Sequence, residues 1–213
     1  MAKDMFRSLV DSTSRELSSD DLVFVLSGDS NFRYTLDPSY KSNRKGSRKP
    51  IVYRELAEWL RGEYPGRVVS KPVLEADDYL GILSTSPTLN GVERIIVSED
   101  KDLLTVPGKL YRKGELLSVS EEEADDYWRY QTLTGDPTDG YKGCPGVGPV
   151  KAKQILAKPG NPWENVRQTF LKAGLTEENV FLQASLSHIC RFADWDSESQ
   201  TVRPLTIFRE NLT

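Results

Sequence analysis

The sequence predicts an α/β fold in which a mainly parallel, twisted sheet with flanking helices is followed by a helical region. Three short apolar runs have the length and composition of strands, at residues 22–26, 67–70 and 94–98. Segments with the apolar spacing of helices separate these runs, and strands that alternate with helices favour parallel pairing. From about residue 121 onward the periodic segments are helical. We therefore expect an α/β domain over residues 1–130 and a helical region over residues 131–213.

The first half of the chain supplies the elements of the predicted sheet in order. The first helix places four apolar residues on one face: Phe6, Leu9, Val10 and Leu17. The polar residues 18–21 end this helix, and the run LVFVL at 22–26 is the first predicted strand. A second helix begins at Pro50, which suits a first helical turn, and ends at Gly62. A third helix covers 75–84, and RIIVS at 94–98 is expected to be a buried strand.

Three segments of the second half have helical patterns. They are VKAKQILA at 150–157, WENVRQTFLKA at 163–173 and EENVFLQASLSHICRF at 177–192. His188 falls inside the last of these segments, so we expect it to have a structural role. Cys144 has no histidine near it in the sequence, so we expect it to be a packing residue and not a nucleophile.

The composition of the chain excludes several classes of protein. The two cysteines, Cys144 and Cys190, are too few for a disulfide framework or a zinc site, which indicates a reducing compartment. The sequence has no apolar run of membrane-spanning length, no signal-peptide pattern and no lipidation motif. We therefore expect a soluble, cytoplasmic protein with no membrane partner.

Positive charge is concentrated in one segment of an acidic chain. The net charge of −4 argues, taken alone, against nucleic acid as a partner. Between Arg33 and Lys49, however, six cations accompany a single acid, Asp37. Phe32, Tyr34 and Tyr40 interleave with these cations, which suits base stacking beside phosphate contacts. A basic run alone is more often a solvated loop, so this segment indicates nucleic-acid binding only in combination with other features of the chain.

Acidic residues form three groups along the chain: Glu75, Asp77 and Asp78, then Asp100 and Asp102, then Asp136 and Asp139. The second group directly follows the run RIIVS, and ligands of α/β folds bind at the carboxyl ends of strands. One group alone could be favourable charge at a helix start or a turn former. Seven carboxylates brought together would repel one another unless cations lay between them, and oxygen ligands favour Mg²⁺ or Mn²⁺ over zinc.

The stretch GDPTDGYKGCPGVGPVKA at 135–152 is rich in glycine and proline. Such a run disfavours regular structure and exposes backbone N–H groups, which can hold an anion such as a phosphate. We therefore expect this stretch to bind the backbone of a nucleic acid.

Five stretches in this order resemble the 5′ nuclease family, which includes flap endonucleases and bacteriophage 5′-to-3′ exonucleases. They are FRYTLDPSYKSNRK, LEADD, SEDKD, GDPTDG and GCPGVGPVKAKQIL. The similarity is greatest to the short replication exonucleases of podovirus-type phages and extends from about residue 22 to about residue 200. The resemblance implies an α/β nuclease domain followed by a helix-three-turn-helix element, in agreement with the alternation of strands and helices.

The resemblance also implies a metal site. The residues that match the family's metal-binding acids are Glu75, Asp77, Asp78, Asp100, Asp102, Asp136 and Asp139. The family has a further aspartate at the end of the strand before the basic segment, and Asp29 is its nearest match. Two Mg²⁺ or Mn²⁺ ions would activate a water molecule and stabilise the leaving 3′ oxygen while a phosphodiester is cut in line.

DNA contacts are implied as well. Lys41 and Arg44, in YKSNR, match basic residues of the family's helical arch, which contact the scissile phosphate and the single-stranded 5′ end; Arg33 is assigned with them. The residues expected to contact DNA elsewhere are Tyr40, Lys45, Gly143, Gly146, Gly148, Lys151 and Lys153. Family members often bind K⁺ at the glycine-rich hairpin, so K⁺ is a further expected ion.

The start of the chain departs from the family pattern. Family members begin with a buried strand that ends in Asp-Gly, whereas this chain begins with the helix that would follow, and neither Asp4 nor Asp11 replaces that aspartate. A missing central strand would leave backbone groups of its neighbours unpaired. Three explanations stay open: a start codon placed too late, a truncated chain, or a split nuclease whose first strand comes from a second chain.

The leading hypothesis is a metal-dependent 5′-to-3′ exonuclease and flap-type endonuclease. It would act on duplex or branched DNA, and on RNA in RNA–DNA hybrids, during phage replication. The first alternative is a catalytically impaired DNA-structure-binding member of the family, and the second is one half of a split nuclease. A small toxin-like ribonuclease is disfavoured, because such domains lack the GCPGVGPVKA element.

Overall fold

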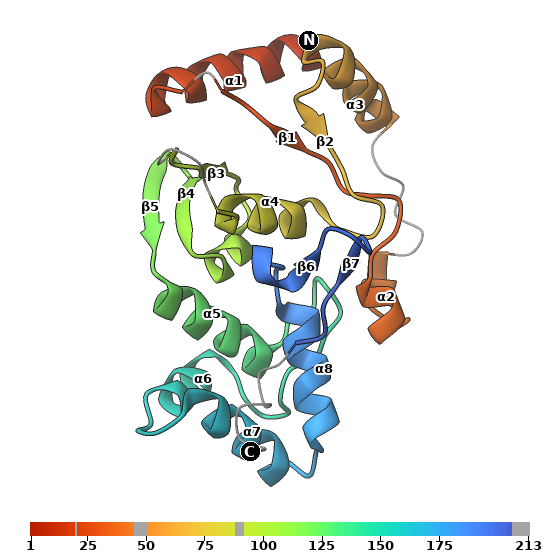
Figure 1. The fold of residues 1–213 in the computed structure, drawn as a ribbon. Coiled ribbons are helices and arrows are strands. Elements are labelled where there is room, and N and C mark those ends of the chain that lie inside the picture. Colours follow the sequence, from red (N-terminus) through yellow and green to blue (C-terminus); the bar gives the residue numbers. More distant parts are fainter. Residues whose placement is uncertain (20, 45–50, 88–91, 206–213) are drawn as a thin grey trace.

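The computed structural model describes residues 1–19, 21–44, 51–87 and 92–205; for Ile51 it describes the backbone and not the side chain. Helices and strands alternate through the first half of the chain, and four helices gather at the opposite end of the molecule (Figure 1). The predicted α/β class followed by a helical region is therefore confirmed. Four short helical turns connect the longer elements: α2 (Arg33–Leu36), η1 (Ser42–Arg44), η2 (Lys101–Thr105) and η3 (Phe192–Asp194).

Two pairs of strands are parallel, and the pair between the first two predicted strands follows the expected alternation with helices, whereas the later strand of the second pair was not predicted. β1 (Phe24–Val25) pairs with β2 (Val68–Val69), and β3 (Ile95–Val97) pairs with β4 (Gly108–Arg112). In the described part of the chain these pairs belong to separate short sheets instead of one continuous sheet. The expectation that 94–98 is a buried strand is only partly right, because Ile96 is buried whereas Val97 is 50% exposed.

Two antiparallel hairpins have no counterpart in the sequence prediction. β4 turns into β5 (Glu115–Val119) through Lys113 and Gly114, whose φ angles are 53° and 76°. Positive φ at both central residues is the geometry of a type I′ turn, for which Asn-Gly or Asp-Gly is the usual sequence. β6 (Trp195–Asp196) and β7 (Thr201–Val202) form the second hairpin. The less usual Lys-Gly pair and the short second hairpin explain why neither was predicted.

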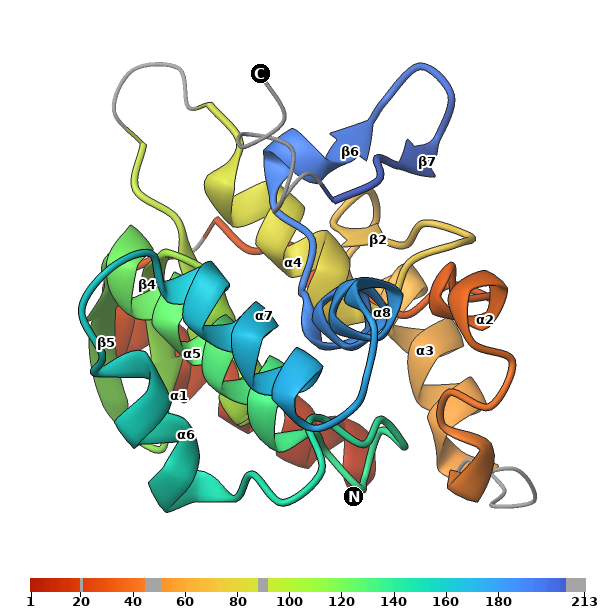
Figure 2. The same ribbon diagram turned by 90° about the horizontal axis from the view of Figure 1, so that it is seen from below.

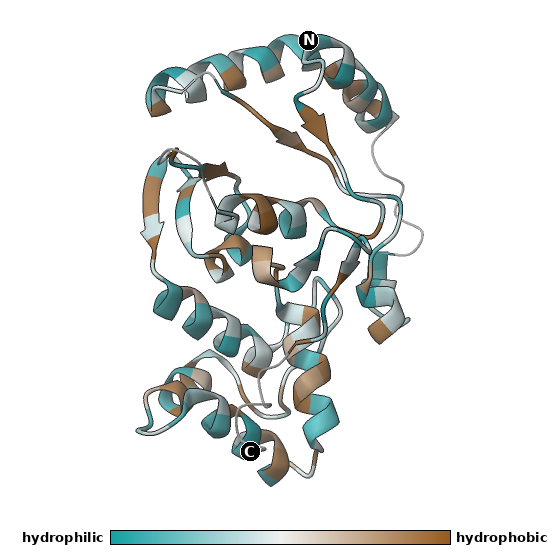
Figure 3. Cartoon of the chain, viewed as in Figure 1, coloured by the Kyte–Doolittle hydropathy of each residue, from teal (hydrophilic) through white to brown (hydrophobic). Residues whose placement is uncertain are grey.

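Aromatic side chains hold the first two long helices against β1. α1 (Ala2–Leu17) brings Phe6 to 5.8 Å from Phe24 and 6.0 Å from Trp59 of α3 (Ile51–Glu63), measured between ring centroids. Leu9 of α1 is 62% exposed and takes no part in this packing. Figure 3 shows the contrast between the hydrophobic strands β1 and β2 and the largely hydrophilic outer helices.

The helical region has its own apolar core. α5 (Glu121–Thr134), α6 (Pro149–Leu156), α7 (Pro162–Lys172) and α8 (Glu177–Ser187) pack around it, as Figure 2 shows from below. Its fully buried members include Leu133, Val166, Phe170 and Val180. The predicted boundary between residues 130 and 131 falls inside α5, and the division into two domains stays a prediction.

α8 ends earlier than its sequence pattern suggests. The predicted helix extends to Phe192, but the helix ends at Ser187 and the next residue, His188, has an extended backbone. The chain then crosses α4 (Ala76–Thr85), where a side chain at Gly81 would lie 2.3 Å from the carbonyl oxygen of Cys190. Tertiary contacts with α4 thus override the helical periodicity of residues 188–192.

Candidate active site

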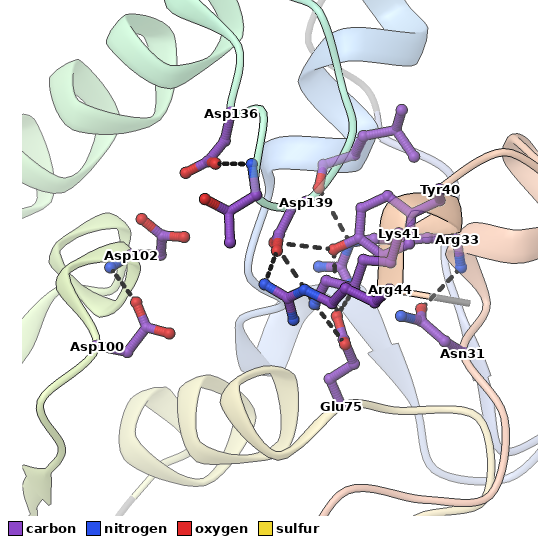
Figure 4. Close-up of polar contacts among 12 residues, drawn as sticks. Asn31, Arg33, Tyr40, Lys41, Arg44, Glu75, Asp100, Asp102, Asp136 and Asp139 are labelled. Carbon is purple, nitrogen blue, oxygen red and sulfur yellow. Dashed lines mark hydrogen bonds and ion pairs between the residues drawn. The ribbon is translucent and has the colours of Figure 1, made fainter. Parts of the chain in front are cut away.

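A polar pocket lies where the segments after β1 and β3 meet the start of α4 and the turn at residues 136–141. Its polar lining includes Ser27, Lys41, Arg44, Glu75, Asp77, Asp100, Asp102 and Asp139. Figure 4 shows that these segments direct their charged side chains toward one another. The structure therefore brings together most of the acids and cations that the sequence singles out.

The base of the pocket is a buried ion pair between Arg33 and Asp78. Two guanidinium nitrogens of Arg33 donate to the two carboxylate oxygens of Asp78, each at 2.8 Å. Arg33 also donates to the carbonyl oxygens of Leu186, at 3.1 Å, and of His188. Burial alone would raise the pKa of Asp78, but the charge and hydrogen bonds of Arg33 hold this pKa below its usual range.

This geometry corrects two assignments made from the sequence. Arg33 is 3% exposed and Asp78 is 1% exposed, so their charged groups are directed at each other inside the protein. Asp78 cannot serve as a metal ligand in this arrangement, because both of its oxygens already accept hydrogen bonds from Arg33. Arg33 likewise cannot contact a scissile phosphate. Both residues support the site from below.

Two cations lie against the acids on one side of the pocket (Figure 4). The ammonium of Lys41 is 2.6 Å from an Oε1 of Glu75 and 3.4 Å from an Oδ2 of Asp139. Arg44 reaches Asp139 at 2.8 Å. The charges of Glu75 and Asp139 are therefore partly compensated by the protein itself.

Tyr40 does not have the exposure that base stacking requires. Its side chain is 2% exposed, and its hydroxyl lies 3.2 Å from both Glu75 and Asp139. The prediction of Tyr40 as a DNA-stacking residue is therefore wrong, since its ring belongs to a core cluster with Tyr141 and Leu186. It helps to orient the two carboxylates.

The segment that carries these cations is docked on the turn at residues 136–141. The backbone N–H of Lys41 donates to the carbonyl oxygen of Asp139 at 2.9 Å, and the amide of Asn43 donates to that of Pro137 at 2.8 Å. Gly140 has a φ of +80°, and a side chain there would approach the backbone of Lys41 to 3.3 Å. Sequence reasoning missed Asn43, whose proximity to this turn depends on a contact across about half the chain.

The other side of the pocket carries Asp100 and Asp102, and Asp136 lies near them (Figure 4). Asp100 caps η2 by accepting a hydrogen bond from the N–H of Asp102 at 2.9 Å. Asp102 in turn accepts a hydrogen bond from the side-chain amide of Gln131 at 2.7 Å. Asp136 accepts from the N–H of Thr138 at 2.7 Å and does not line the pocket itself. It lies beside the pocket as a neighbour of this group.

Two of the pocket acids have strongly raised pKa values. Burial, together with the nearby charge of Asp100, raises the pKa of Asp77 to about 7. Burial and Asp100 also raise the pKa of Asp102 to about 6. Such shifts arise where carboxylates crowd together without enough positive charge. A bound divalent cation would supply that charge.

The chemistry of the lining fits hard divalent cations, although the described residues include no three acidic, histidine or cysteine side chains already grouped around one point. Glu75, Asp77, Asp100, Asp102 and Asp139 all line the pocket and offer carboxylate oxygens. Mg²⁺ and Mn²⁺ prefer such ligands. Two of these acids, Glu75 and Asp139, are held by Lys41 and Arg44 in this structure.

The position after β1 also differs from the sequence-based assignment. Asp29 is exposed and is not among the lining residues; Ser27 faces the pocket instead. Its hydroxyl accepts a hydrogen bond from the N–H of Ala76 at 3.1 Å and so caps the start of α4. Asp29 is therefore removed from the set of candidate ligands. Ser27 is the first polar residue after the apolar run, which is the signal that could have found it.

The glycines of the hairpin differ in what they do. Gly143 is buried, and a side chain there would come within 2.3 Å of the backbone nitrogen of Gly135, so it serves packing and not ligand contact. Gly146 has a φ of +70° and, like Gly148, is exposed with open space around it. The exposed residues Lys151 and Lys153 follow on α6. Lys45, also expected to contact DNA, lies outside the described residues.

The family of the chain follows from its first 124 residues. Residues 2–124 match the family described as 5′-3′ exonuclease, N-terminal resolvase-like domain. The chain belongs to the 5′-to-3′ exonuclease family. This 5′ nuclease is 30% identical over 210 residues to the exodeoxyribonuclease of Enterobacteria phage T3, covering 82% of this chain and 70% of the relative. It is also 30% identical to the exonuclease of Escherichia phage T7, and the alignment covers 86% of this chain and 74% of that relative. The resemblance and the enzyme class, a phosphodiester hydrolase, are confirmed.

Solved structures agree with the fold. The T5 D15 protein co-crystallised with metal ions superposes with a TM-score of 0.62 at 15% identity, covering 87% of this 5′ nuclease and 84% of that chain. A T5 D15 flap endonuclease variant in a pseudo-enzyme-product complex with DNA and metal ions gives a TM-score of 0.60 at 15% identity, covering 87% and 82%. At this identity the likeness shows the fold alone. Within the described residues, no helix combines the length and apolarity needed to cross a membrane.

The buried ion pair predicts a large loss of stability when one partner is removed. Arg33→Met should lower the free energy of unfolding of this 5′ nuclease by roughly 3–5 kcal/mol, because Asp78 would be left buried and unpaired. Urea unfolding measures this loss. Arg54→Met, which removes an exposed arginine paired with Glu58, is the matched control and should cost less than about 1 kcal/mol. A loss at Arg33 as small as that of the control would contradict this role of the pair.

The raised pKa of Asp77 predicts a pH-dependent gain in stability on its removal. Between its ordinary pKa near 4 and its folded value of about 7, the folded state binds a proton that the unfolded state lacks. The unfolding free energy contributed by Asp77 therefore falls as the pH rises through this window. In EDTA, Asp77→Asn should be more stable than the parent at pH 8 by on the order of 2 kcal/mol, with little difference at pH 4.

Thermal unfolding at the two pH values tests this expectation. Asp29→Asn, which changes an exposed aspartate outside the pocket, is the control and should show no comparable gain at pH 8. Equal stabilities of Asp77→Asn and the parent at pH 8 would show that Asp77 ionises there without repulsion.

Proposed function

We propose that this 5′ nuclease is a divalent-metal-dependent 5′-to-3′ exonuclease and flap-type endonuclease that acts on DNA. The observation that carries the proposal is a single pocket with crowded carboxylates on one side and two cations on the other. The T5 D15 structures, one co-crystallised with metal ions and one in complex with DNA and metal ions, support the same assignment by analogy. Asp77, Asp100 and Asp102, with Glu75 and Asp139, are the residues that would hold two Mg²⁺ or Mn²⁺ ions. When bound, the ions would supply Lewis-acid activation of water and stabilise the negative charge of the leaving oxygen.

Lys41 and Arg44 supply the positive charge for the reacting phosphate in this proposal. Both lie within 4 Å of pocket carboxylates and both line the pocket. Cations that lie at the edge of an acidic pocket can exchange a carboxylate partner for a phosphate oxygen, and positioned donors of this kind stabilise the charge of a transition state. The contact between Asn43 and the turn at 136–141 keeps them near the acids.

Duplex DNA would bind beyond the pocket at the glycine-rich hairpin. Gly146 and Gly148 are exposed with open space at the position of a side chain, and the ammonium of Lys151 lies 3.2 Å from the carbonyl oxygen of Gly146. Lys151 and Lys153 add positive charge at the start of α6. The proposal also includes a K⁺ ion bound at this hairpin and RNA in RNA–DNA hybrids as a further substrate. It places the activity in phage replication and in the cytoplasm.

A strand supplied from outside the described chain is part of the proposal as well. In parallel pairing, alternate residues direct their backbone groups to opposite edges. Among the described residues, β1 pairs only with β2 and β3 only with β4, so β1 and β3 each keep one uncovered edge. Such edges accept an additional strand. This observation favours a second chain, or a further segment, as a partner, and makes the half of a split nuclease the second candidate function.

Metal dependence is tested with Asp100→Asn. We expect cleavage of a 5′-labelled duplex to require Mg²⁺ or Mn²⁺ and to be lost in the mutant, whose DNA binding in Ca²⁺ should be unchanged. Asp29→Asn should cut like the parent, because Asp29 does not line the pocket. Cutting in excess EDTA would disprove the metal site. A parent chain that binds DNA tightly but never cuts would favour the catalytically impaired or split alternatives.

The two cations are tested together. Lys41→Met with Arg44→Met should lower single-turnover cleavage by about ten- to a thousandfold, the range for loss of electrostatic transition-state partners. The same mutant should bind Mn²⁺ more tightly in the absence of DNA, because the ammonium that competes for Glu75 and Asp139 is gone. Lys109→Met, which removes a lysine paired with Glu93, is the control. An equal loss in DNA binding and cleavage would reduce the pair to ordinary phosphate contacts.

A further inference from the structure

Gln131 is a buried glutamine next to the pocket that none of the roles above uses. It lies in α5, is 4% exposed, and donates a hydrogen bond from Nε2 to Oδ1 of Asp102 at 2.7 Å. Its own Oε1 is buried and has no hydrogen-bond partner among the described residues. The orientation of the amide is therefore set by its bond to Asp102, since the opposite orientation would place an oxygen against the carboxylate.

The pocket acids differ in what holds them. Glu75 and Asp139 are held by Lys41 and Arg44, whose charges offset their own. Asp102 is held by a neutral amide, and the described residues contain no ion pair to its carboxylate. A neutral donor orients a carboxylate without neutralising it. The hydrogen bond from Gln131 goes to Oδ1 of Asp102, which leaves the other carboxylate oxygen for a cation.

We propose that Gln131 is a positioning residue that holds Asp102 in the orientation in which it binds a divalent cation. The inference rests on the proposed metal-dependent function and names the residue that prepares its ligand. Groups that hydrogen-bond to a metal ligand fix its orientation, and their loss typically lowers metal affinity by about 10- to 100-fold. A buried amide with one unpaired acceptor lowers the stability of the folded protein. Local departures from stable packing of this kind occur at functional sites, which agrees with a role for Gln131 in the site.

The position of Gln131 explains why a glutamine suits this role. Asp102 lies in η2 and Gln131 lies one turn before the end of α5, so the side-chain hydrogen bond joins η2 to the helix that leads into the turn at residues 136–141. The backbone carbonyl of Gln131 also accepts a hydrogen bond from the N–H of Gly135, at 2.9 Å, directly before Asp136. The side chain and the backbone of this one residue thus connect Asp102 to the start of the acidic turn.

Mn²⁺ binding to the intact chain without DNA tests the inference. Gln131→Met has a similar length but no donor, and it should weaken Mn²⁺ binding about 10-fold. Gln131→Asn keeps an amide but is one carbon shorter, so it should show a similar loss. Gln168→Met, at an exposed glutamine of α7, is the matched control and should bind Mn²⁺ like the parent. Thermal unfolding of each variant verifies that it is folded.

A double-mutant cycle separates positioning from packing. If Gln131 acts through Asp102, Gln131→Met should change Mn²⁺ affinity little when Asp102→Asn is already present. Cleavage should show the matching split, with a shift of about 10-fold in the Mn²⁺ concentration for half-maximal rate and a smaller change at saturating Mn²⁺.

Each result decides a different claim. Parent-like Mn²⁺ affinity in both Gln131 variants, an equal loss in the Asp102→Asn background, or failure of both variants to fold would overturn the positioning role. A parent chain that binds no Mn²⁺ at all would instead overturn the proposed metal-dependent function on which the inference rests.

Discussion

The buried ion pair between Arg33 and Asp78 is the constraint on which the geometry of the pocket depends. It joins the segment after β1, the first turn of α4 and the residues that end α8, because Arg33 also binds the carbonyl oxygens of Leu186 and His188. Neither charge can be buried without the other, so the three segments must assemble together. As a result Glu75 and Asp77 are placed at the pocket wall, and α8 stops where the chain must turn toward Asp78.

Above this base, the acids of the pocket fall into two electrostatic kinds. Glu75 and Asp139 are compensated by cations from the segment that follows α2, whereas burial and the nearby charge of Asp100 raise the pKa values of Asp77 and Asp102. Glu75 and Asp139 can release Lys41 and Arg44 to a phosphate, whereas Asp77 and Asp102 attract divalent ions. This separation of charge within one pocket is what makes hydrolysis of a phosphodiester the chemistry the pocket supports best.

Local patterns in the sequence were sufficient for the fold class and for the gathering of the acids. The parallel pairing of β1 with β2, most helices and the pocket-lining acids after β3 follow from periodicity and from the rule that ligands gather at strand ends, whereas β4 was not predicted. Burial could not be predicted in the same way. The sequence pattern predicted that Asp78 and Arg33 belong to functional clusters, and only their contact in the structure shows that they neutralise each other. Ser27 was missed in favour of Asp29, and Gln131 was missed because no local pattern links it to Asp102.

Diffraction from crystals of the chain grown with Mn²⁺, measured at the manganese absorption edge, tests the central claim most directly. The account predicts anomalous peaks inside the pocket, within about 2.0–2.3 Å of oxygens of Asp102 and its neighbouring acids, with Lys41 moved away from Glu75. Full occupancy of Mn²⁺ at other sites, with Lys41 still between Glu75 and Asp139 and no peak in the pocket, would contradict it.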